Sequence, residues 1–192
     1  SFAYSYTQQI YAQPEINFSG PITKLRFYYA SGDMANSSDW TIYMGHTIRT
    51  AFDSNADWVA LSDLTEVFDG DVGATPASAG WMEITLNTPF VYDNVNNLVI
   101  AVHQYTPGLS STEVRWGSFF CNTDVSLAYY DDIDNPNPAS PPTATYRSIR
   151  KNCIQLVFPE PVAPVDSYPW TENFDSTAAG EMPDGWTVIA SQ

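Results

Sequence analysis

The stretch best supplied with metal ligands is the acidic and amide-rich loop from Asp131 to Asn137. Asp132, Asp134 and Asn137 offer oxygen donors within a few residues, and hard cations such as calcium take oxygen ligands. The loop lacks the glycine and the terminal glutamate of an EF-hand, so a plain turn, in which Asp and Asn bond to their own backbone, is the favoured alternative. Structural calcium is the one cofactor that these residues suggest, and the sequence requires none.

Four aromatic residues could do a different kind of chemistry, the recognition of a sugar ring. An exposed ring offers a flat apolar area with a polar edge. The candidates lie opposite, or out of line with, the aliphatic rows of their strands; they are Tyr28, Tyr43, Trp81 and Trp116. A sandwich core also consumes rings, so core packing is the favoured alternative for each one. Exposure of two or more on one surface would favour ligand binding.

The sequence contains no pattern typical of a catalytic centre. It has no nucleophile with a base and an orienting acid, no carboxylate pair in a defined motif and no phosphate-binding loop. Two scattered acids could still form a glycosidase pair in three dimensions, which a sequence does not show. We therefore predict a protein that is not an enzyme, with the accessory domain of a secreted hydrolase as an alternative.

The charge of the chain argues against two classes of partner. Seven Lys and Arg against 22 Asp and Glu give a formal net charge of −15, so a bare phosphate backbone would be repelled. Nucleic acid is therefore excluded as an expected partner. No window approaches the roughly 18 apolar residues of a membrane span, so we expect no direct insertion into a membrane.

The two cysteines, Cys121 and Cys153, allow a single pairing and show no CxxC or Cys/His metal spacing. We expect a disulfide in preference to two free thiols, because the other features of the chain are extracellular in character. Free thiols remain the alternative.

The elements that must position these residues are predicted to be strands. Leu98 to Val102 is a run of five apolar residues between turn-forming segments, too short for a helix and well bounded for a strand. We expect this strand to be buried on both faces, which requires two covering layers. Alternating patterns elsewhere give roughly nine or ten strands and no helical period. The fold class is therefore all-β, an antiparallel β-sandwich with jelly-roll topology and an extended C-terminal segment.

The composition changes abruptly after residue 158. We predict a β-sandwich module over residues 1–158, a Pro-rich linker over residues 159–167 and the truncated start of a second β domain over residues 168–192. An unfinished domain needs something to hold it. We therefore expect Trp170, Phe174 and Trp186 to dock on their own sandwich or on a neighbouring copy, for example by adding a strand to a sheet edge.

Residues 1–158 resemble modules of large secreted or surface proteins of Bacteroidetes-type bacteria. The resemblance is carried by Tyr4–Tyr11, Ile22–Tyr29, Trp40–Thr47 and Asn97–Val102. Such modules are mostly uncharacterised, so this resemblance implies export and says little about function.

The tail resembles the opening of a cleaved-adhesin domain, the jelly-roll type found in gingipain haemagglutinin regions. Trp170–Asp175 and Met182–Thr187 carry this resemblance. In that family a carboxylate near the first strand helps to hold a structural calcium, and the matching residue is Glu172, or less closely Asp175. The resemblance implies export, a multidomain architecture and adhesion.

Together these observations predict a non-catalytic module of an exported multidomain surface protein, secreted or held at the cell surface. Its expected work is adhesion or ligand binding, with carbohydrate as the candidate ligand. The expected partners are a host or glycan surface ligand and other domains of the same polypeptide. A structural spacer that binds no ligand is the alternative.

Overall fold

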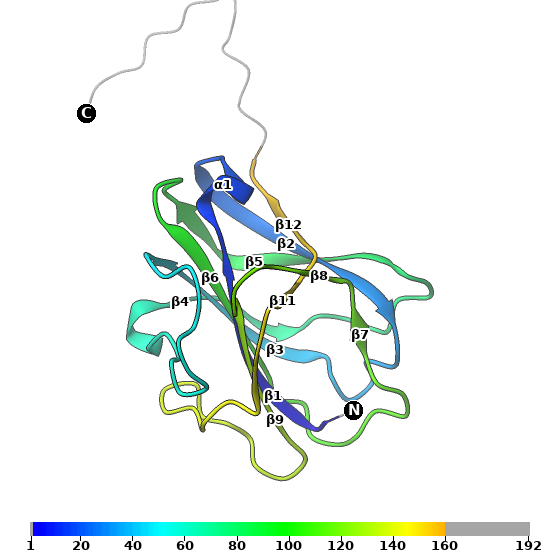
Figure 1. The fold of residues 1–192 in the computed structure, drawn as a ribbon. Coiled ribbons are helices and arrows are strands. Elements are labelled where there is room, and N and C mark those ends of the chain that lie inside the picture. The colour runs from blue at the N-terminus through cyan, green and yellow to red at the C-terminus, as the bar shows by residue number, and fades with distance from the viewer. Residues whose placement is uncertain (1, 160–192) are drawn as a thin grey trace, which may run out of the picture. The chain divides into compact units, whose positions relative to one another are not determined.

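In the computed structural model, which describes residues 2–159, short alternating apolar patterns form strands and turn residues separate them (Figure 1). The helical elements of this range are one turn of α-helix, α1 (Gln13–Ile16), and a 3-10 turn, η1 (Leu61–Asp63). The strands are β1 (Tyr4–Tyr11), β2 (Gly20–Ser31), β3 (Asp39–Thr47), β4 (Thr65–Asp71), β5 (Gly80–Tyr92), β6 (Asn97–Gln104), β7 (Arg115–Trp116), β8 (Ser118–Phe120), β9 (Ser126–Asp131), β10 (Tyr146–Ser148), β11 (Arg150–Asn152) and β12 (Ile154–Val157). The predicted all-β class is confirmed.

The strands form two antiparallel sheets that pack on each other. The larger sheet has the order β10-β9-β1-β6-β3-β4, and the smaller has the order β12-β2-β5 with β7 also paired to β2. Strands β8 and β11 form a separate two-stranded ribbon. These layers are consistent with the predicted β-sandwich, whereas the jelly-roll topology stays a prediction. No helix within residues 2–159 is long and apolar enough to cross a lipid bilayer.

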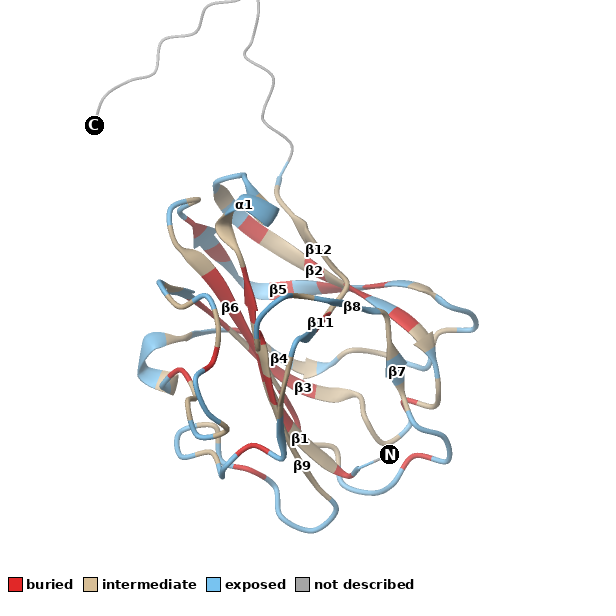
Figure 2. Ribbon diagram, in the orientation of Figure 1, coloured by how far each residue is buried: buried red, intermediate tan, exposed pale blue. Residues whose placement is uncertain are grey.

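Strand β6 is buried on both faces, as its apolar run predicts (Figure 2). Leu98 and Ile100 pack in the cluster between the two sheets, whereas Val99 faces the opposite way. The layer over this second face of β6 differs from the expectation. Loops form much of it, where a sheet was expected. The residues that pack with Val99 are Ile10, Phe52, Val59, Leu127 and Ala144.

Hydrogen bonds from the sheet hold these covering loops in place. Gln8 is inaccessible to solvent, and its side-chain amide donates to the Val59 carbonyl at 2.9 Å and accepts from the Val59 N–H at 2.8 Å. Arg147 donates to the carbonyl oxygen of Phe52 at 2.9 Å. A loop can cover a sheet only if its buried backbone groups find partners, and these contacts supply them.

The expected disulfide is not formed, and both thiols are free. The register of the β8–β11 ribbon explains why. The Cys121 N–H donates to the Ile149 carbonyl and the Cys153 N–H donates to the Gly117 carbonyl, so the cysteines lie at opposite ends of the ribbon. Four residues of extended chain span about 13 Å, whereas a disulfide requires Cα atoms within about 7 Å.

We predict that unreduced protein, denatured and alkylated, gains two adducts per chain by mass spectrometry, one on Cys121 and one on Cys153. The expected result follows from the distance that the ribbon register imposes. A single species without adducts after the same treatment, and two adducts after reduction, would show that the cysteines are paired.

The sandwich is a compact unit that ends at Pro159. The rest of the predicted linker and the predicted second domain lie outside the described residues. The same holds for Glu172 and for the docking prediction made for Trp170, Phe174 and Trp186.

Candidate ligand-binding site

Two rings and three charged side chains share the outer face of the smaller sheet. Strands β2 and β5 pair so that Tyr28 lies opposite Trp81 and Arg26 lies opposite Glu83. Lys24 is the next outward residue of β2, because alternate residues of a strand face opposite sides. The residues that alternate with them are buried and face the core; they are Leu25, Phe27, Tyr29, Met82 and Ile84.

Tyr28 and Trp81 form an exposed edge-to-face pair. Their ring centroids lie 5.3 Å apart with an interplanar angle of 84°. Tyr28 is 36% exposed and Trp81 44% exposed, so both rings offer area to a ligand. Gly117 packs against Tyr28, since a Cβ at this glycine would lie 2.9 Å from the ring atom Cδ1. The backbone at Gly117 therefore limits the movement of the ring on that side.

Charged groups stand next to the rings in a fixed arrangement. The Glu83 carboxylate accepts from Lys24 Nζ at 2.6 Å and contacts Arg26 Nη2 at 2.7 Å. These hydrogen bonds from Lys24 and Arg26 lower the pKa of Glu83 and keep it ionised. Arg26 also donates to Gln155 Oε1 at 3.1 Å. Donors and acceptors are thus already oriented beside a planar apolar surface.

This arrangement suits the binding of a flat polar ligand better than it suits a reaction. A saccharide has an apolar C–H face that can lie on an aromatic ring and hydroxyl groups that can bond to neighbouring polar side chains. The side chains stand on two paired strands, so little ordering of the backbone is needed when a ligand binds.

The structure does not bring the other two aromatic candidates to this face. Trp116 packs edge-on against Trp40, with ring centroids 5.5 Å apart, and belongs to the partly buried rim of the core. This packing favours the core alternative for Trp116, and its role as a ligand contact stays a prediction. Tyr43 lies on the other sheet and faces away from the core side that holds Ile42 and Met44. Burial and the charge of Glu66 raise the pKa of Tyr43.

Sequence reasoning missed a second group of exposed rings. Phe2 stacks on Tyr130 with centroids 3.7 Å apart, and the Tyr130 hydroxyl bonds to that of Tyr146 at 3.1 Å. That hydrogen bond, with burial, raises the pKa of Tyr130 to about 12. The signal was present in the pair Tyr129 and Tyr130, because adjacent strand residues face opposite sides of the sheet and both rings cannot pack in one cluster.

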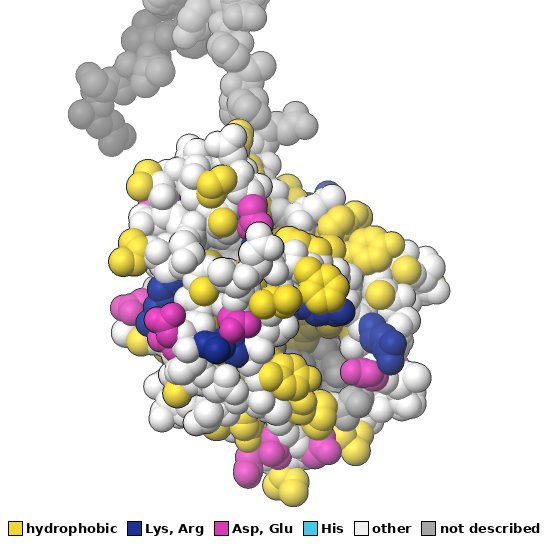
Figure 3. All heavy atoms as spheres, in the orientation of Figure 1, with side chains coloured by type: hydrophobic (Ala, Val, Ile, Leu, Met, Phe, Trp, Pro, Cys, Tyr) yellow, Lys and Arg dark blue, Asp and Glu magenta, His cyan; other side chains and the backbone are white. Residues whose placement is uncertain are grey.

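The β8–β11 ribbon exposes further apolar area. Figure 3 shows hydrophobic side chains gathered in the middle of the face that carries this ribbon. Phe120 is 64% exposed, and the Arg150 guanidinium lies 4.0 Å from its ring centroid. Within residues 2–159, Arg150 is the one Lys or Arg residue without a carboxylate partner. Phe119 and Phe120 are adjacent strand residues, so their rings also face opposite sides and cannot both pack in one cluster.

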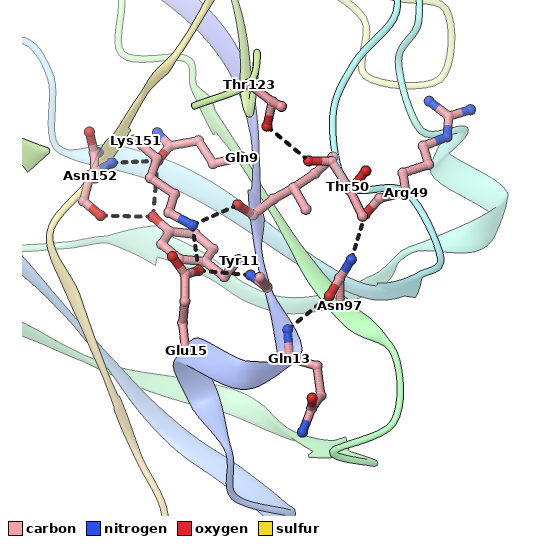
Figure 4. A network of polar contacts seen from close by, with 12 residues as sticks. Gln9, Tyr11, Gln13, Glu15, Arg49, Thr50, Asn97, Thr123, Lys151 and Asn152 are labelled. Carbon is pink, nitrogen blue, oxygen red and sulfur yellow. Dashed lines mark hydrogen bonds and ion pairs between the residues drawn. The ribbon is translucent and has the colours of Figure 1, made fainter. Parts of the chain in front are cut away.

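An apolar pocket of about 370 Å³ opens beside the ribbon. The buried Lys151 ammonium pairs with Glu15 Oε2 at 2.5 Å and donates to the Ile10 carbonyl at 3.2 Å (Figure 4). Burial, with the nearby thiols and Glu15, raises the pKa of Tyr11 well above its usual value. The pocket has one carboxylate, whereas glycoside hydrolysis uses two. Its lining residues are Tyr11, Glu15, Ile16, Phe119, Ile154, Leu156 and Phe158.

The acidic loop is built as a turn. Asp131 Oδ1 accepts from the N–H groups of Asp134 at 2.9 Å and Ile133 at 2.7 Å, and these bonds lower the pKa of Asp131. Asp132, Asp134 and Asn137 are exposed, and no group of three His, Cys, Asp or Glu side chains within residues 2–159 could hold a metal ion. The loop thus gives the calcium prediction no support.

Comparisons of the chain with protein-family models, with curated proteins and with solved structures find no match. The resemblances drawn from the sequence therefore stay predictions. The outer face of the smaller sheet, which carries Tyr28 and Trp81, is called the ring-bearing face below.

Proposed function

We propose that this protein is a non-catalytic ligand-binding module of an exported multidomain surface protein, and that the outer face of its smaller sheet binds a saccharide. One observation carries the proposal: Tyr28 and Trp81 are both exposed, touch edge to face and adjoin an ordered row of charged side chains. Core packing was the favoured alternative for each ring taken alone, and it does not account for two rings exposed on one face.

The exposed area is large enough to matter for affinity. A tryptophan buries up to about 250 Å², so the exposed part of Trp81 is roughly 100 Å². Covering half to all of this area contributes about 1.3 to 2.5 kcal/mol. Because 1.4 kcal/mol corresponds to a tenfold change in Kd, a single ring decides whether a weak saccharide ligand is detected.

We predict that Trp81→Ala weakens saccharide binding by about tenfold or more. A glycan array would select the ligand, and isothermal titration calorimetry would give Kd for the wild type and the variant. Tyr146→Ala is the matched control, because Tyr146 is an exposed ring on the other sheet. Its Kd should equal that of the wild type.

The same experiment decides between this function and the alternatives. If the wild type showed no measurable binding to glycans or host proteins, this would contradict the proposal and favour the structural spacer. Equal weakening by Trp81→Ala and Tyr146→Ala would show that the ring-bearing face is not the site. A saccharide-binding face also fits an accessory domain that brings a secreted hydrolase to its substrate.

A further inference from the structure

The ring-bearing face has a local surplus of positive charge. Lys24 and Arg26 share a single carboxylate, that of Glu83, so these three groups sum to a charge of +1. The side chains of the two cations are 38% and 39% exposed. They are thus accessible to a ligand as well as to Glu83.

This two-to-one arrangement is unusual within the sandwich. The other pairs between Lys or Arg and a carboxylate in residues 2–159 are one-to-one; they are Arg49 with Asp57, Arg115 with Glu113, Arg147 with Asp124, and Lys151 with Glu15. The net charge of the whole chain is −15. The one cluster with surplus charge in these ion pairs therefore lies beside the Tyr28–Trp81 pair.

Donors remain available on both cations. Lysine has three N–H donors and arginine has five, and the contacts to Glu83 and Gln155 do not use them all. Both oxygens of Glu83 are occupied by these cations. Repulsion from the rest of the chain is screened within about 8 Å at physiological ionic strength. An anion at this face therefore meets free donors, and the carboxylate beside them is already paired.

We propose that the ligand of this face is an acidic saccharide, a pyranose chain with carboxylate or sulfate groups. This inference rests on the proposed saccharide function. Arg26 and Tyr28 are two residues apart on β2, so their Cα atoms lie about 7 Å apart. One sugar unit can lie on the rings while the anionic group of the same or the next unit meets Arg26 and Lys24. Arginine is well suited to this contact because its planar group bonds to two anion oxygens at once.

The test compares an acidic saccharide with its neutral ester, which has the same ring stereochemistry, and with a sulfated saccharide. Tetragalacturonate, its methyl ester and a sulfated tetrasaccharide would each be titrated into the full chain at 50 and 500 mM NaCl. We expect one of the two acidic probes to bind, with a Kd that rises with salt, and the neutral ester to bind more weakly. The two acidic arms decide between carboxylate and sulfate.

Two substitutions at the site and two matched controls assign the effect to the site. Arg26→Gln should weaken binding of the acidic probe by about two- to fivefold, the range of an exposed ion pair. Glu83→Gln should tighten it by a similar factor, because a competing carboxylate is removed. Arg150→Gln and Glu66→Gln are matched controls that change the same charges elsewhere on the surface, and each should leave Kd unchanged.

The outcomes separate the inference from the function beneath it. Equal binding of the acid and its ester, or a loss with Arg150→Gln in place of Arg26→Gln, would overturn the acidic ligand at this face while saccharide binding still stands. Binding of neutral glycans alone on the array would do the same. If the protein bound no glycan at all, both the acidic-ligand inference and the proposed saccharide-binding function would be overturned.

Discussion

Leu98→Ala should lower the free energy of unfolding by about 3 kcal/mol, and Val99→Ala by about 2 kcal/mol. Both residues are inaccessible to solvent but face opposite sides of β6. Each substitution leaves a cavity in a different cluster, one between the sheets and one beneath the loops. Urea unfolding followed by circular dichroism measures both values.

Val95→Ala is the matched control for this pair. Val95 is 77% exposed in the turn before β6, so its replacement should change stability by less than about 0.5 kcal/mol. If Val99→Ala were as mild as Val95→Ala, the loops would not cover the sheet. The description of loops as the cover for the second face of β6 would then be wrong.

Lys151→Met should cost about 2 kcal/mol of stability, although methionine keeps the length of the apolar stem. The change removes the ammonium that donates hydrogen bonds to the Ile10 carbonyl and to Glu15. The carbonyl is then left without its side-chain donor. Glu15 is 44% exposed and water can solvate it, so the loss stays below that of a fully buried pair.

The same substitution at Lys24 provides the comparison. Lys24 pairs with Glu83 at 2.6 Å, but both side chains are about one third exposed. Lys24→Met should therefore cost less than about 1 kcal/mol. Equal losses at the two lysines would mean that the burial of Lys151 contributes nothing to the strength of its contacts.

Strand positions with a clear local pattern were predictable from the sequence. Leu98–Val102 forms a buried strand because five apolar residues between turns have no other stable place. Tyr28 and Trp81 face outward because their neighbours in β2 and β5 are aliphatic or aromatic residues that fill the core. In the first case a continuous apolar run indicates burial on both faces, and in the second the alternation decides the side of the sheet.

Features that depend on distant pairings were not predictable. Lys151 and Glu15 are 136 residues apart, and only the closed sandwich brings them together. The separation of Cys121 from Cys153 depends on the register of a ribbon of three-residue strands, too short to leave a pattern. Trp116 lies in the two-residue strand β7, where alternation gives no direction.

Nuclear magnetic resonance of the tryptophan indole N–H groups tests the central claim most directly. The acidic oligosaccharide that binds in calorimetry would be titrated into labelled protein. We predict that the indole signal of Trp81 shifts with ligand concentration. The signals of Trp40 and Trp58, whose indoles donate to the carbonyls of Ser37 and Pro142, should stay in place. A ligand that binds without moving the Trp81 signal would contradict a saccharide site on the outer face of the smaller sheet.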